Sequence, residues 1–163
     1  MGMRAGLAPL SAAQLDALRA DPDAVGKVVY SNDEQDREHA IDLDKAWHGI
    51  HWLLTGEGWG GEPPLSLAIL GGTDIGPDQG YGPARFVTPQ QVGAVAVALA
   101  ALTDEDLARR YDAKTMDERH IYPTVWERDG AEALGYLIHH VHVLARFYAK
   151  AAQRGDAVLQ WIS

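Results

Sequence analysis

The sequence contains no cysteine, and this absence removes several kinds of chemistry. Without a thiol, the chain forms no disulfide, no thiolate nucleophile and no zinc site with cysteine ligands. Serine is also scarce, and none of the serines lies in the G-x-S-x-G turn of serine hydrolases. We therefore expect neither a cysteine nor a serine nucleophile.

The sequence also has few positively charged residues. The chain has 14 Lys and Arg against 23 Asp and Glu, which gives a formal net charge of −9. Proteins that bind nucleic acids or anionic membranes depend on basic side chains to meet phosphate groups. The composition thus predicts no nucleic-acid partner and no membrane partner. It makes a cationic protein the natural electrostatic partner.

Long apolar runs are missing as well. The longest, residues 92–102, is too short for a membrane span, which needs about 20 residues, and it predicts a buried helix instead. The first ten residues hold one basic residue and no long apolar segment, so they do not read as a signal peptide. These features predict a cytoplasmic protein.

The residues that are present suit one domain with a real core. The chain has 163 residues, of which 47% are hydrophobic and 23% charged, and it shows neither a linker nor an internal repeat. Helix-start patterns pair Ser11 with Gln14, Thr88 with Gln91 and Thr103 with Asp106, and Asp129 is expected to cap the longest helix. Strands are expected at residues 4–10, 84–87 and 157–163, and residues 71–83 are expected to form a glycine-rich loop. We predict an α+β fold: a single, largely helical domain over residues 1–163, with a small sheet that includes the N- and C-terminal strands.

The stretch L-D-K-A-W-H-G-I-H-W-L-L-T-G, residues 43–56, predicts an amphipathic helix that ends at Gly56. On a helical wheel Trp47 falls in the apolar stripe, whereas Trp52 falls on the far side, which predicts an exposed indole. His48 and His51 share one face, but H-G-I-H lacks the spacing and the glutamate of the H-E-x-x-H zinc motif. We expect no metal and no cofactor, and we expect histidines at the edge of the core that bond to the backbone.

A second motif is G-E-G-W-G-G, residues 56–61. It has the G-x-G-x-x-G form, but it follows a helix and precedes Pro63-Pro64, so it is not a dinucleotide-binding turn. Trp59 lies between its glycines. An exposed tryptophan there would be an anchor for a partner, and a buried one would pack the loop against the core.

The sequence resembles the YfbM-like family of bacterial proteins, a group described as a domain of unknown function. The resemblance runs over nearly the whole chain, from M-G-M at the start to the last strand. Its most specific part matches the family pattern D-K-x-W-x-x-x-H-x-x-L-T-G, with Asp44, Lys45, Trp47, His51 and Thr55 in place, whereas His48 lies outside the pattern and looks incidental. Shorter matches are P-L-S and I-L-G within residues 64–71 and I-Y-P at residues 121–123. The resemblance implies an α+β fold and no established activity.

Two functions remain open at this stage. The first is a non-enzymatic, acidic protein that binds a partner, such as an immunity-like or antitoxin-like inhibitor of a cationic enzyme. It rests on the negative charge, on the small size, on the lack of a coherent catalytic set and on long loops that can present Trp59 and Tyr81. The alternative is a small enzyme or ligand-binding protein with a pocket around His51, Thr55, Arg119 and Tyr122, in which His51 is the acid or base and Arg119 holds an anion. The candidate binding residues are therefore Trp47, His51, Thr55, Trp59, Arg119 and Tyr122, and no catalytic residue is assigned.

Overall fold

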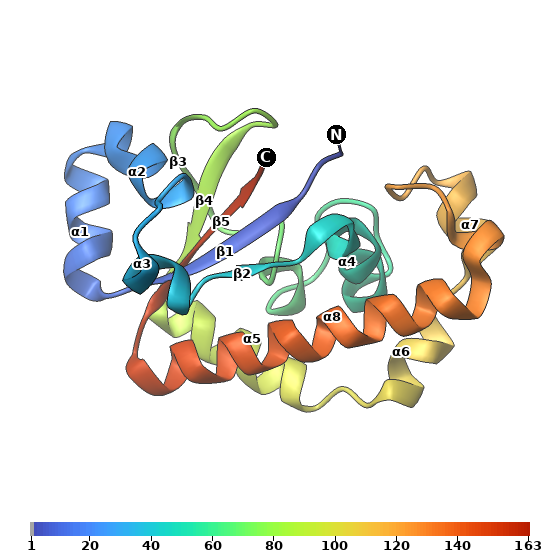
Figure 1. Cartoon of the computed structure of the whole chain (residues 1–163). Coiled ribbons are helices and arrows are strands. Elements are labelled where there is room, and N and C mark those ends of the chain that lie inside the picture. Colours follow the sequence, from blue (N-terminus) through green and yellow to red (C-terminus); the bar gives the residue numbers. More distant parts are fainter. Residues whose placement is uncertain (1) are drawn as a thin grey trace.

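The fold is built on a five-stranded antiparallel sheet, in the order β2-β1-β5-β4-β3, in a computed structural model that describes residues 2–163. The first strand, β1 (Ala5–Leu10), pairs along its full length with the last, β5 (Ala157–Ile162). β4 (Pro83–Val87) and β3 (Thr73–Asp78) extend the sheet on one side, and the short β2 (Ile41–Asp42) closes the other. The two ends of the chain therefore lie close together (Figure 1), and the expected sheet with both terminal strands is confirmed.

Helices cover both faces of this sheet because alternate strand residues point to opposite sides. On one side, α4 (Trp47–Thr55), α5 (Pro89–Ala100) and α8 (Trp126–Arg154) pack in the main core. The other side holds a smaller core under α1 (Ala12–Ala20) and α2 (Val25–Val29). The remaining helices are α3 (Glu34–Glu38), α6 (Asp104–Arg110) and α7 (Ala113–Glu118), with 3-10 turns at Pro22–Ala24, Asp44–Ala46 and Leu65–Leu67. The α+β, largely helical prediction is confirmed.

The helix starts follow the local sequence. At Ser11, Thr88 and Thr103 the side-chain oxygen accepts from the backbone N–H three residues on, and the side chain at that position accepts in return from the cap N–H. Each capping box satisfies two backbone donors that the helix itself leaves unpaired. These three predictions depend on neighbouring residues only, and all three are confirmed.

The prediction that Asp129 caps the longest helix is wrong. α8 begins at Trp126, and the Asp129 carboxylate instead bonds to its neighbour Arg128. The start of α8 is capped from outside the helix by Asp117, which accepts from the backbone N–H of Trp126 at 3.2 Å and of Glu127 at 2.9 Å. Gly130, with φ of 49° and ψ of −120°, is not helical, so α8 consists of a short first segment and a long second segment that begins directly after Gly130.

Residues 71–83 are not one continuous loop, which is a second correction, although 71–72 and 79–82 do lie outside the strands. Thr73–Asp78 forms β3 and pairs antiparallel with β4, with a register shift between Ile75 and Asp78. Only Ile75 of this strand is buried, so the sequence has no alternation of apolar and polar residues that would indicate a strand. With β2, this gives five strands where about three were expected. Pairing with β4 supplies the backbone partners that define the strand.

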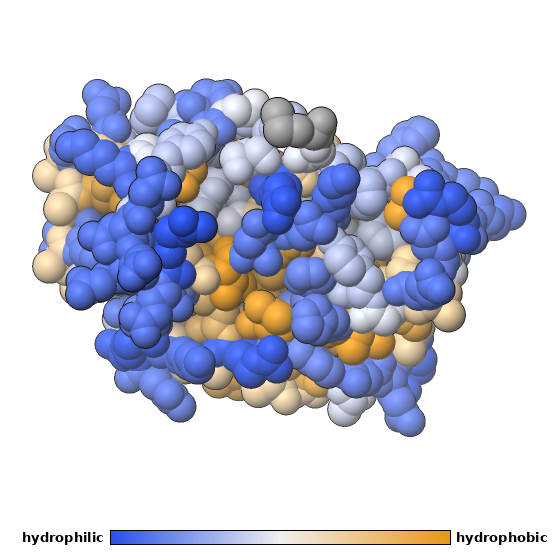
Figure 2. Space-filling view, in the orientation of Figure 1, coloured by the Kyte–Doolittle hydropathy of each residue, from blue (hydrophilic) through white to orange (hydrophobic). Residues whose placement is uncertain are grey.

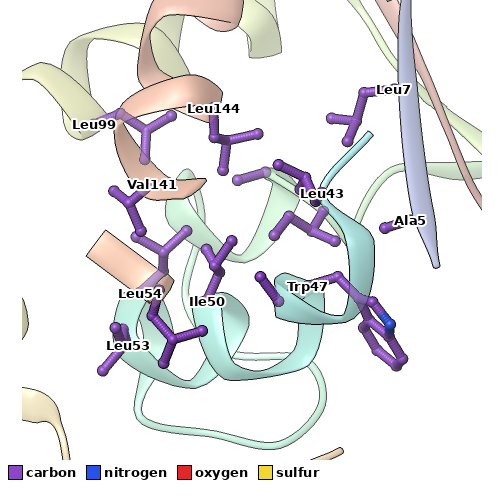
Figure 3. Packing of buried hydrophobic residues seen from close by; sticks show 14 of the residues in the cluster. Ala5, Leu7, Leu43, Trp47, Ile50, Leu53, Leu54, Leu99, Val141 and Leu144 are labelled. Atoms are coloured by element: carbon purple, nitrogen blue, oxygen red, sulfur yellow. The ribbon is translucent and has the colours of Figure 1, made fainter. Parts of the chain in front are cut away.

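Helix α4 lies within the core instead of at its edge. Figure 3 shows Trp47, Ile50, Leu53 and Leu54 among side chains from α5, α8 and β1. Trp52 is only 7% exposed, so the prediction of an exposed indole is wrong. The helical wheel assumed one covered side, but the Arg119 guanidinium lies 5.7 Å from the Trp52 ring and α6 also packs on α4. Arg110 of α6 donates to the Leu53 carbonyl at 3.0 Å.

The distribution of hydrophobic residues on the surface reflects this arrangement of the helices. In Figure 2 hydrophobic residues gather in a band across the middle of the visible face, whereas the region of α3 is mostly hydrophilic. Among residues 2–163, no helix is both long enough and apolar enough to cross a bilayer.

Candidate functional site

Trp59 lies in the segment between α4 and Pro64, and it is the most exposed tryptophan in the two sequence motifs. Trp59 is 66% exposed, yet its ring centroid lies 4.8 Å from that of His48 and 6.1 Å from that of Trp47. The ring of Tyr122 stacks on the indole of Trp47, with 5.8 Å between the two ring centroids. We call Trp47, His48, Trp59 and Tyr122 the aromatic cluster. It fixes the position of Trp59 while leaving most of its surface free.

His48 is central to this arrangement, which corrects the view that it is incidental. Its Nδ1 accepts from the backbone N–H of Tyr122 at 2.9 Å. Nδ1 is therefore unprotonated, and the other nitrogen, Nε2, carries the proton and donates to the Gly58 carbonyl at 2.9 Å. Burial lowers the pKa of His48, so the neutral ring is favoured. His48 thus joins α4 to the two segments that carry Trp59 and Tyr122.

His51 lies one turn further along α4 and is 1% exposed. Neither ring nitrogen has a hydrogen-bond partner within residues 2–163. Burial lowers the pKa of His51 to about 4. The polar backbone of Gly60 raises this pKa in part, and the nearby His48 ring lowers it further. The hydroxyl of Thr55 donates to the His51 carbonyl at 2.8 Å and accepts from the N–H of Glu57, so Thr55 closes the end of the helix.

The four residues of the alternative pocket make separate contacts. The rings of His51 and Tyr122 belong to the interior of α4 and to the aromatic cluster. Arg119 is exposed on the surface, 3.9 Å from the Glu57 carboxylate and over the face of Trp52. His51 is thus buried, whereas Arg119 lies on the surface beside Glu57. None of the four lines the cavity described next.

A cavity of about 290 Å³ lies beside Trp59, between residues 56–71, the β3–β4 turn and the ends of β1 and β5. Two of the six candidate residues, Trp47 and Trp59, line it. Its other apolar walls include Ile69, Leu70 and Tyr81, and Tyr81 is 56% exposed at the turn. A concave, mostly apolar and aromatic site with a few polar groups is typical of binding sites in proteins.

Two polar residues that sequence reasoning missed also line this cavity. Arg85 on β4 and Gln160 on β5 are directly paired in the sheet register. Arg85 donates from Nε to the Asp74 carboxylate at 3.0 Å and from Nη1 to the Leu70 carbonyl. Gln160 donates from Nε2 to the Leu67 carbonyl at 2.6 Å and to the Tyr148 hydroxyl at 2.9 Å. No motif marks these residues, because only the pairing of β4 with β5 brings them together.

The structure offers no cluster suited to a metal ion: residues 2–163 contain no group of three or more His, Cys, Asp or Glu side chains arranged for one. In α8, His139 and His142 are exposed and His140 is half-buried. His142 bonds to Asp104 at 2.7 Å, whereas His140 packs edge-on against Tyr136 at 4.7 Å. The rings of His139 and His140 also meet edge-on at 5.2 Å, whereas His142 faces Asp104.

Comparison with known proteins identifies the family. A family model described as "Domain of unknown function (DUF1877)" matches residues 1–161. None of the curated proteins matches. Among solved structures, the chain is similar to YfbM from Escherichia coli, described as a protein of unknown function, with 21% identity, a TM-score of 0.76, and coverage of 98% of this chain and 99% of that one. This likeness shows a shared fold, and the family model spans almost the whole sequence. The chain therefore belongs to the DUF1877 family, whose function is unknown.

Proposed function

We propose that this protein is a non-enzymatic, acidic binding protein that docks a cationic protein partner on the surface around Trp59 and Tyr81. More specifically, the proposal is that this partner is a cationic enzyme, and that the protein inhibits it as an immunity protein or antitoxin does. The observation that carries the proposal is the exposed Trp59, which is held in place by the aromatic cluster.

Trp59 has the properties of an interface anchor. Tryptophan and tyrosine are enriched among the residues that contribute most to protein–protein binding. Trp59 leaves most of its surface open, and Tyr81, which lines the same cavity, is also more than half exposed. The contacts of Trp59 with His48 and Trp47 restrict its ring before a partner arrives. Less conformational entropy is therefore lost on binding.

The charge of the chain favours a basic partner. The net charge is −9, and Glu57 and Glu62 are exposed in the same segment as Trp59. Acidic surface raises the rate of encounter with a cationic protein, and this effect weakens with salt because the Debye length falls from about 30 Å at 0.01 M to about 8 Å at 0.15 M.

The test is affinity capture from a lysate of the source organism with three baits: the unaltered protein, Trp59→Ala, and Val97→Ala as a control at another exposed apolar residue. The captured protein is identified by mass spectrometry and purified, and its binding rates are measured at low and physiological salt. We expect a basic partner whose association slows markedly with salt. Trp59→Ala should speed dissociation and leave the salt dependence unchanged, whereas Val97→Ala should behave like the unaltered protein.

Charge reversal at exposed Asp33, Glu34 and Asp36 should have the opposite effect, with slower association and unchanged dissociation. The proposal fails if the captured protein is acidic, if its association does not respond to salt, or if Trp59→Ala binds as well as the unaltered protein.

A further inference from the structure

A second cavity, of about 360 Å³, lies on the side of the sheet that α1 and α2 cover. It is enclosed by the end of β1, by α1, α2 and α3, and by the end of α8, and these segments lie at one end of the molecule (Figure 1). Its volume falls within the range of about 300–1,000 Å³ that is usual for small-ligand sites. It shares no lining residue with the cavity beside Trp59.

The apolar walls of this second cavity are aliphatic. Leu10 of β1, Leu18 of α1 and Val28 of α2 line it, and Ala17 and Ala24 contribute only small side chains. Among residues 2–163 no aromatic side chain lines it, and α3, which forms one wall, has no buried residue. An alkyl chain that enters such a space loses contact with water and gains dispersion contacts with the walls. We call this space the aliphatic cavity.

Basic side chains gather where the aliphatic cavity meets α8. Arg154 lines the cavity together with His39 and Lys27. His39 and Arg154 also line a neighbouring hollow of about 160 Å³, whose walls include Arg146 and Lys150. The two spaces therefore adjoin, and the second adds two cations to the first.

The balance of charge here is the reverse of that in the whole chain. The two spaces are lined by four basic residues and three acidic ones, whereas the whole chain has 14 basic and 23 acidic residues. Two of the acidic residues already accept hydrogen bonds within the chain. Asp156 accepts from Arg154, and Asp36 accepts from the Ser31 hydroxyl, each at 2.7 Å. The third, Glu38, lies on α3.

The spacing of the cations on α8 also points to an anion. Arg146, Lys150 and Arg154 are four residues apart, so they lie on one face of the helix, and like charges at this spacing repel each other. The helix dipole favours a cation in the last turn, which accounts for Arg154, but Arg146 lies two turns earlier. Arg146 and Lys150 form no ion pair within residues 2–163. An anion beside them would reduce this repulsion.

We infer that the aliphatic cavity binds a medium-chain aliphatic carboxylate, such as octanoate. The alkyl chain lies between β1, α1 and α2, and the carboxylate lies at the α8 end, beside Arg154 and His39 and toward Lys150. The net charge of −9 disfavours a multiply charged anion, so a single carboxylate is expected to bind better than a phosphate ester. This inference does not depend on a protein partner at Trp59, because the two sites have no residue in common.

The experiment is a calorimetric titration of octanoate into the purified protein. We expect a dissociation constant of about 1 mM or tighter, which is reasonable for so few ligand atoms. Butyrate and hexanoate test the alkyl chain, because each methylene that enters the cavity should tighten binding by up to about fourfold.

Two further ligands keep the chain length of octanoate and change its head group. Octylammonium has the opposite charge, and the overall charge of the protein would by itself favour it over octanoate. Octanamide has no charge. We expect octanoate to bind about fivefold more tightly than either, because only the carboxylate is attracted by the basic residues of the cavity.

Variants locate the site on the protein. Ala17→Trp adds bulk at an exposed position that lines the cavity and should weaken octanoate binding at least about tenfold, whereas Ala13→Trp, exposed on the same helix outside the cavity, should not. Arg154→Gln should weaken binding about fivefold. Its matched control is Arg128→Gln, because Arg128 is likewise paired with a nearby aspartate at 2.7 Å but lies at the other end of α8. Thermal unfolding shows whether each variant is folded.

The inference is supported by octanoate binding that increases with chain length, exceeds that of octylammonium and is weakened by Ala17→Trp and Arg154→Gln. No binding of octanoate at millimolar concentration would overturn it. Equal or tighter binding of octanamide would show an apolar cavity that does not recognise the carboxylate, and equal or tighter binding of octylammonium would show that the overall charge decides. Unchanged binding in folded Ala17→Trp would place octanoate elsewhere on the protein.

Discussion

Acidification should destabilise this protein through His51, and the structure allows the size of the effect to be worked out. In the unfolded chain the imidazole has a pKa of 6.5, whereas burial lowers the pKa of His51 in the folded protein to about 4. Between these values the unfolded state binds a proton that the folded state does not bind. The free energy of unfolding therefore falls as the pH drops through this range. One pKa unit corresponds to about 1.4 kcal/mol, so the full loss is about 3 kcal/mol.

The other titrating groups of the structure can be separated from this effect. His48 and the half-buried His140 also have pKa values lowered by burial, and both add a loss of the same sign below 6.5. Asp44 and Asp106 have pKa values below 3.8, so their contribution to stability is present above that value and is lost only at lower pH. The window between about 6.5 and 4 thus belongs mainly to the buried histidines.

The assay is urea denaturation at a series of pH values between about 7 and 4, which gives the free energy of unfolding at each pH. His51→Phe retains a ring but does not titrate, so its stability should fall by about 3 kcal/mol less than that of the unaltered protein over this range. His39→Gln, at an exposed histidine that contacts no other histidine, is the matched control and should follow the unaltered protein. Parallel curves for His51→Phe and the unaltered protein would refute the argument.

Other predictions concern packing. Trp47→Ala and Trp52→Ala should both cost about 3–5 kcal/mol in unfolding free energy, because both indoles are buried, and a much smaller loss for Trp52→Ala would contradict the buried position. Gly49→Ala should lower stability by about 1–3 kcal/mol in urea denaturation, although alanine favours helices, since its Cβ would lie 2.6 Å from the Trp126 ring. A Gly49→Ala variant of unchanged or greater stability would show that this ring can move. Gly93→Ala, at a helical glycine of α5 with open space around it, is the matched control and should be neutral or stabilising.

Features that depend on a few neighbouring residues could be predicted from the sequence. The capping boxes at Ser11, Thr88 and Thr103 form because the residue that completes each one is three positions away. Gly56 ends α4 in the left-handed conformation, with φ of 74°, for the same local reason. The terminal strands were also predictable, because residues 5–10 and 157–162 are short apolar segments that need a partner.

Features that depend on distant segments could not be predicted. β3 has one buried residue, Ile75, and exists because β4 pairs with it. α8 is capped by Asp117 of another helix, whereas the sequence suggested Asp129. Trp52 is buried because Arg119 and α6 cover a side that a helical wheel assigns to solvent.

The features of the candidate site also fall into those that the local sequence determines and those that the tertiary structure determines. The sequence alone determined the acidic charge, the absence of thiol chemistry, and the position of Trp59 among glycines, because composition and local motifs need no fold. Only the tertiary structure decided that His48 holds the segment bearing Trp59, since its partners Gly58 and Tyr122 lie 10 and 74 positions away. Arg85 and Gln160 are farther apart still in the sequence, and they are neighbours only through the register of β4 and β5. Strand register follows from the hydrophobic pattern of whole strands and from turn geometry, and not from a motif at the two paired positions, so no local pattern indicated that these two residues meet.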